Sequence, residues 1–174
     1  MTEMNLLMKK LKDSRSKKVI FISHCILNIN TRYFGGAFRS DSIHEIIELI
    51  QKKEIGLIQM SCPEQKAWGG LLKPYMWMGF GIKKTILYYF RFIFLPLFKF
   101  YTGLVYNKLA NEVVNNIMDY IKSGFHVVGI IGVDGSPSCG ILKTLDLKKS
   151  FNYFANQTMN DLNRKKFNQA LYNT

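Results

Sequence analysis

The sequence has few acidic residues and few cysteines. Its 174 residues hold 12 Asp and Glu against 24 Lys and Arg, a formal net charge of +12 with neutral histidines. Such an excess favours anionic partners and says nothing about the fold. Three cysteines are too few, and odd in number, for the disulfide framework of a small secreted domain. No charged start followed by an apolar run of signal-peptide length opens the chain, so we expect a cytoplasmic protein.

Internal repeats, low-complexity tracts and linkers rich in Gly, Ser or Pro are also missing. Apolar residues make up 48% of the chain and charged residues 21%, a balance that excludes an intrinsically disordered tail. The length suits one hydrophobic core. We therefore expect a single α/β domain over residues 1–174.

The hydrophobic pattern alternates between strands and helices. Short apolar runs indicate three buried strands, at 19–23, 55–60 and 125–133. Helical periodicity predicts four helices, at 3–13, about 41–53, 105–123 and about 156–172. We expect the first of these to lie on the body of the domain, and the Ser-Asp-Ser of 40–42 to cap the second. Near-continuous apolar strands that alternate with helices are typical of a mostly parallel sheet with helices on both faces, a three-layer arrangement.

A long stretch without acidic residues separates Glu64 from Glu112. It holds seven basic residues and 13 of the 24 aromatic residues. We interpret 72–104 as an insertion of one or two kinked helices that packs on the sheet edge or on a second copy in a homodimer. Two charges and a proline interrupt its apolar run at 86–105, and each charge would cost about 2.5–3.5 kcal/mol at a bilayer centre, which argues against a membrane span. Contact of 86–105 with a membrane surface or with nucleic acid is the alternative.

Each of the three cysteines follows the carboxyl end of one expected strand: Cys25, Cys62 and Cys139. In a parallel sheet those ends share one edge, where ligand sites form. We expect the thiols to meet there and to hold a soft metal, either zinc or an iron–sulfur cluster. A zinc site would need a fourth ligand. His24 is the direct neighbour of one cysteine and His126 lies at the far end of its strand, so neither fits well.

Three segments together resemble the thiouracil desulfidase family. The residues that carry the resemblance are Ser-His-Cys followed by Arg-Tyr-Phe-Gly-Gly within 23–36, Cys-Pro-Glu at 62–64, and Ser-Pro-Ser-Cys-Gly at 136–140. The likeness covers the regions around 18–36, 55–70 and 125–141, and nothing in the aromatic stretch. Asn28 stands where the family usually has Gly, and Phe34 where it has Asp. These departures lie near the expected pocket, so they affect substrate identity more than metal binding.

The resemblance implies a 4Fe–4S cluster held by Cys25, Cys62 and Cys139, with one iron left open. It further implies that the sulfur of a thiocarbonyl substrate, such as a thiolated nucleobase, binds that iron while a carboxylate activates water for hydrolytic removal of the sulfur. Glu64 is the expected base and Asp134 the second choice. The residues expected to contact substrate or cluster are Arg32, Asn28, Ser136 and Ser138.

Two other classes of function stay open. One is a metal-containing RNA-binding protein, with tRNA as a partner of the basic aromatic stretch. The other is a zinc or cluster sensor without catalysis. In both, Glu64 is a loop or helix-terminal charge, Asp134 shapes a turn, the two serines cap turns and Arg32 is a surface charge.

Overall fold

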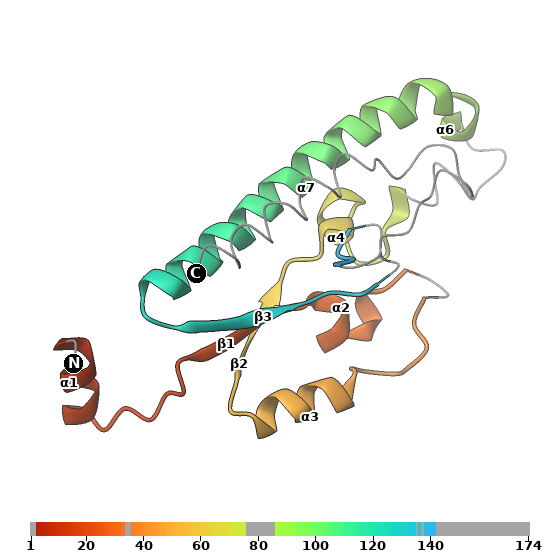
Figure 1. The fold of residues 1–174 in the computed structure, drawn as a ribbon. Helices are drawn as coiled ribbons and strands as arrows, with labels where there is room; N and C mark the ends of the chain where they lie inside the picture. Colours follow the sequence, from red (N-terminus) through yellow and green to blue (C-terminus); the bar gives the residue numbers. More distant parts are fainter. Residues whose placement is uncertain (1–2, 34–35, 76–85, 135, 137, 142–174) are drawn as a thin grey trace.

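The computed structural model describes residues 3–33, 36–75, 86–134, 136 and 138–141. The elements run in the order α1 (Glu3–Lys10), β1 (Lys18–Ser23), α2 (His24–Leu27), the 3-10 turn η1 (Ile29–Thr31), α3 (His44–Lys52), β2 (Gly56–Met60), α4 (Pro63–Ala67), α6 (Ile86–Tyr89), α7 (Arg91–Lys122) and β3 (His126–Ile131). Figure 1 shows their arrangement. The helix expected at about 156–172 lies outside the described residues.

The three strands form one parallel sheet in the order β2-β1-β3. Val19 of the central strand pairs with Gly56 on one side and with Val127 on the other. Because β1 has a neighbour at each edge, all its residues from Val19 to Ser23 are buried. The α/β class, the parallel sheet and the three expected strands are confirmed.

Side chains of β1 alternate between two hydrophobic clusters. Ile20 and Ile22 pack with Ile50 of α3, whereas Phe21 packs with Ile117 of α7. Successive residues of a strand point to opposite faces, and α3 and α7 accordingly lie on opposite sides of the sheet in Figure 1. The apolar ladder predicted for 105–123 therefore covers one face of β1.

The helix expected at 105–123 is the second half of a longer one, because α7 begins at Arg91. Its first half takes in much of the aromatic stretch and packs on α4, where Trp68, Phe98 and Tyr106 are buried together. Pro96 lies inside α7, and its missing N–H removes one helical hydrogen bond. Burial of Leu95 and Phe98 beside it offsets that loss. Among the described residues, no helix is long and apolar enough to cross a membrane.

Two local predictions are wrong. The helix expected over 3–13 forms as α1, but Leu7 and Leu11 of its apolar stripe are more than half exposed, so it does not rest on the domain through them. Periodicity defines an apolar face of a helix but not what that face meets. The helix α3 begins with Ile43 as its cap residue and without a side-chain cap. None of the residues 40–42, expected to cap it, does so. Asp41 instead accepts from the amide N–H of Ser42 and pairs with His44.

Candidate functional site

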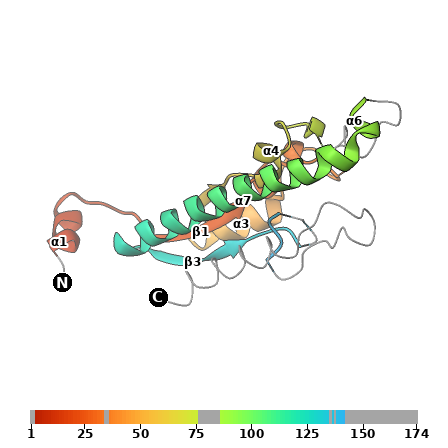
Figure 2. The same ribbon diagram turned by 90° about the horizontal axis from the view of Figure 1, so that it is seen from above.

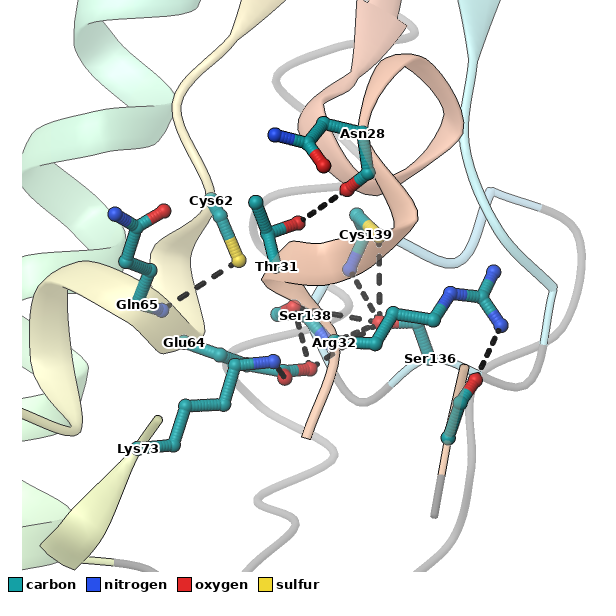
Figure 3. Close-up of polar contacts among 11 residues, drawn as sticks. Asn28, Thr31, Arg32, Cys62, Glu64, Gln65, Lys73, Ser136, Ser138 and Cys139 are labelled. Atoms are coloured by element: carbon teal, nitrogen blue, oxygen red, sulfur yellow. Dashed lines mark hydrogen bonds and ion pairs between the residues drawn. The ribbon is translucent and has the colours of Figure 1, made fainter. Parts of the chain in front are cut away.

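Each of the three cysteines lies after one of the three strands. Cys25 is in α2, directly after β1. Cys62 is the N-cap residue of α4, directly after β2. Cys139 is in the loop that follows β3. Since the strands are parallel, all three positions lie beyond the same edge of the sheet, and Figure 3 shows Cys62 and Cys139 there.

The thiols of Cys25 and Cys139 lie close enough to interact by a hydrogen bond. This contact lowers the pKa of Cys139 to about 6, helped by hydrogen-bond contacts with Ser136 and Ser23. The same contact raises the pKa of Cys25, and burial raises it further. Ser136 Oγ lies 3.3 Å from Cys139 Sγ and accepts from the amide N–H of Cys139 at 3.3 Å. The pair therefore holds one thiolate and one thiol near neutral pH.

Cys62 completes the group of thiols. Its Sγ accepts a hydrogen bond from the amide N–H of Gln65 at 3.5 Å, as an N-cap side chain does. Burial raises the pKa of Cys62, and the nearby charges of Glu64 and Cys139 raise it as well. In the part of the chain that the structure describes, no three His, Cys, Asp or Glu side chains lie close enough to share one metal ion.

Glu64 is buried beside the cysteines and makes an ion pair with Lys73. Its exposed fraction is 6% and that of Lys73 is 3%. Lys73 Nζ donates to Glu64 Oε2 at 2.7 Å. The other carboxylate oxygen, Oε1, accepts from Ser138 Oγ at 3.0 Å and from Ser136 Oγ at 3.4 Å. One carboxylate therefore joins the α4 segment to the Cys139 loop, as Figure 3 shows.

Lys73 is a site residue that was not predicted from the sequence. There it was only one of the seven basic residues between Glu64 and Glu112. Two neighbouring glycines, Gly69 and Gly70, adopt positive φ angles of 87° and 104°. These angles favour glycine and turn the chain back, so that Lys73 reaches Glu64. Lys73 itself has φ of 50°, which is uncommon for a residue with a Cβ atom. A Gly-Gly pair shortly after Cys-Pro-Glu is the signal that could have found it.

Two buried hydroxyls at the site lack a well-aligned hydrogen bond: Ser23 Oγ and Tyr106 OH. Ser23 ends β1 and contributes to the low pKa of Cys139. Burial raises the pKa of Tyr106 well above its usual value, and the charges of Glu64 and Cys62 add to that rise. Ser23 Oγ contacts Cys139 and Tyr106 OH contacts Ser138, but neither contact has good hydrogen-bond geometry. Both hydroxyls are therefore donors available to a bound group.

Of the remaining predicted site residues, Arg32 lies near Cys25, whereas Asn28 and Asp134 are exposed. Arg32 Nη1 donates to the carbonyl of Gly36 at 3.2 Å, and its guanidinium lies 4.6 Å from the ring centroid of Phe38. Asn28 is exposed and its Oδ1 accepts from the amide N–H of Asn30, which caps η1. Asp134 is exposed after β3. The structure thus gathers Glu64, the two serines and the three cysteines, and leaves Asn28 and Asp134 at the surface.

Comparison with known proteins gives one similarity. The chain is 25% identical over 130 residues to the uncharacterised protein MJ0003 of Methanocaldococcus jannaschii, an alignment that covers 74% of this chain and 71% of that protein. No protein-family model matches the chain. No solved structure matches it.

Proposed function

We propose that this chain is an iron–sulfur-dependent desulfidase, which hydrolytically removes sulfur from a thiocarbonyl compound such as a thiolated nucleobase. The observation that carries the proposal is the position of three free cysteines after the three parallel strands, beside a buried carboxylate. The proposal includes a cytoplasmic, three-layer α/β domain with its metal site at the carboxyl ends of the strands.

The donor set fits a 4Fe–4S cluster. Cys25, Cys62 and Cys139 would hold it through thiolates, the ligands that such clusters prefer. Each thiolate of a cluster binds its own iron, so the three sulfur atoms need not converge on one point as zinc ligands do. The hydroxyls of Ser23 and Tyr106, which lack well-aligned hydrogen bonds, suit hydrogen bonds to cluster sulfur. When bound, the cluster supplies a Lewis acid at its open iron for the substrate sulfur.

Glu64 is the general base. Its Oε1 faces the cysteine loop through Ser138, while Lys73 holds Oε2 and fixes the orientation of the carboxylate. Glu64 accepts a proton from water as the water oxygen adds to the thiocarbonyl carbon. The carbon–sulfur bond then breaks, and the products are the carbonyl compound and hydrogen sulfide. Water supplies both the oxygen and the protons, so no electrons are exchanged.

Three further residues take the roles that their positions suit. Ser136 and Ser138 orient Glu64 by donating to it. Arg32, close enough to Cys25 to lower its pKa slightly by charge, is suited to hold a carbonyl or anionic group of the substrate. Asp134 remains the second choice of base, and Asn28 is occupied in capping η1.

Purification without oxygen, followed by iron and sulfide analysis, tests the cofactor. The proposal expects about four irons and about four sulfides per chain, with the visible absorbance of a cluster. A Cys62→Ser variant should lose most of this iron, whereas Ser40→Ala, an exposed serine, should keep it. Zinc alone, or no metal after anaerobic reconstitution with iron and sulfide, would overturn the desulfidase. With the cofactor established, sulfide release from thiolated bases and nucleosides tests the reaction.

The buried ion pair itself favours a second candidate, a metal sensor or RNA-binding protein without catalysis. A carboxylate with both oxygens engaged could serve only to join the loops that carry Cys62 and Cys139. An RNA-binding protein would lose affinity steeply with salt, because phosphate contacts release counterions. This candidate would be favoured if the protein holds an intact cluster but releases no sulfide from any thiolated compound.

A further inference from the structure

The exposed face of α7 changes character along its length. In the first half of α7, together with the end of α6, the exposed residues are mainly large and apolar: Tyr89, Phe90, Phe92, Ile93, Leu97, Phe100, Tyr101 and Leu104. In the second half the exposed residues are polar or charged: Lys108, Asn111, Glu112, Asn115, Asn116, Asp119 and Lys122. The opposite face is buried in both halves, for example at Phe98 and Ile117.

The apolar half is a continuous surface. Ile93, Leu97, Phe100 and Leu104 follow the spacing i, i+4, i+7 and i+11, which places them in one stripe along the helix. Phe92 and Phe100 are 67% and 69% exposed. Single exposed apolar residues are ordinary, but a contiguous group of this size marks a contact surface. We name it the aromatic face, defined as the exposed residues of 89–104.

The charge around the aromatic face indicates which kind of partner it contacts. No acidic residue occurs between Glu64 and Glu112, and the exposed Lys99 and Lys108 lie within or next to the face. Two copies of the chain that met through it would bring these cations together without acidic partners. An anionic surface has the complementary charge, and aromatic side chains prefer the boundary between headgroups and acyl chains.

We propose that α6 and the first half of α7 dock flat on an anionic lipid bilayer through the aromatic face. No described helix is able to cross the membrane, so the contact is peripheral. Figures 1 and 2 both show α6 far from α1. The proposal does not depend on the reaction proposed above.

Co-sedimentation of the full chain with vesicles tests this docking. Vesicles of phosphatidylglycerol and phosphatidylcholine in equal amounts should bind the protein, and pure phosphatidylcholine should bind it much less. A Lys99→Gln change should weaken binding to the anionic vesicles about fivefold at low salt, which corresponds to about 1 kcal/mol per lysine near an anionic surface. High salt should remove this difference.

The aromatic contribution is tested with Phe92→Ser/Phe100→Ser. Its partition to anionic vesicles should fall at least about tenfold, since each ring loses its insertion into the interface. Leu49→Ser is the matched control: Leu49 is exposed on α3, outside the aromatic face, and its loss should leave binding unchanged. Circular dichroism checks that the variants keep their helices.

A second measurement covers the case in which the double variant fails to fold. In Phe100→Trp, lipids brominated on the acyl chain should quench the new indole, whereas in Leu49→Trp they should not. No binding to anionic vesicles at low salt, or equal binding by Phe92→Ser/Phe100→Ser, overturns the proposal. A dimer of the lipid-free protein that the Phe100→Ser change alone dissociates also overturns it, because the face would then belong to a second copy.

Discussion

Lys73 Nζ lies 2.7 Å from Glu64 Oε2, and both side chains are buried at the carboxyl edge of the sheet. A buried charge is tolerated only when it is paired and hydrogen-bonded. Here the pair is completed by Ser138 and Ser136, which come from the loop that carries Cys139. The ion pair thus connects the positions of two cysteines, and its removal should affect both stability and the thiols.

Loss of the lysine should destabilise the protein strongly. Lys73→Met leaves the Glu64 carboxylate buried without its cation, a change that costs about 3–5 kcal/mol of unfolding free energy. Urea denaturation of the reduced, metal-free protein measures it. Lys66→Met is the matched control, because Lys66 is exposed on α4 two residues after Glu64, and it should change the unfolding free energy by less than about 0.5 kcal/mol. Equal effects of the two changes would show that the pair contributes little.

Glu64→Gln should separate catalysis from cluster binding. It keeps the shape of the side chain but cannot accept the proton of water, so kcat for sulfide release should fall at least about 10²-fold with iron content unchanged. Asp134→Asn is the control and should retain most activity, since Asp134 is exposed. The reverse pattern would make Asp134 the base. Loss of iron in Glu64→Gln would instead assign the carboxylate a structural role.

The thiol of Cys139 should be reactive at neutral pH in the metal-free protein. Its pKa is lowered to about 6 by hydrogen-bond contacts with Cys25 and Ser136, so the thiolate predominates above that pH and the thiol below it. Alkylation by iodoacetamide, located by mass spectrometry, should rise through a midpoint near pH 6. Ser136→Ala should move the midpoint upward, and Ser42→Ala, far from the thiol, should not. A midpoint for Cys139 at the ordinary cysteine pKa would refute the hydrogen-bonded pair.

Tyr106→Phe should have opposite effects on the metal-free and the loaded protein. Its buried hydroxyl has no well-aligned partner, so removing it should stabilise the metal-free fold by about 1 kcal/mol. If the hydroxyl donates to a bound cluster, the same change should speed the loss of iron to a chelator. Tyr101→Phe, at an exposed tyrosine, should do neither. Destabilisation of the metal-free protein by Tyr106→Phe would mean that the hydroxyl is already satisfied.

Several elements of the fold were predictable because their cause is local. Each strand is a short apolar run that is recognisable in the sequence. The apolar i, i+4 pattern over 105–123, which includes Leu109 and Ile117, predicted the buried face of α7. The sequence predicts kinked helices over 72–104 and a separate helix over 105–123, because Pro96 is a local signal for a break. In the structure α7 runs through Pro96. Burial of Phe98 against α4 overrides that signal, and the contact joins residues far apart in the sequence.

The α/β class, and the position of Cys25, Cys62 and Cys139 on one side of the sheet, follow from the hydrophobic pattern of the sequence. Parallel strands all end on the same side, so the position of each cysteine after its strand was sufficient. The pairing of Glu64 with Lys73, rather than with another lysine, is visible only in the folded protein. That pairing depends on the turn at Gly69 and Gly70 and on the burial of both charged side chains. A local sequence pattern predicts neither the path of a loop nor the exclusion of water from it.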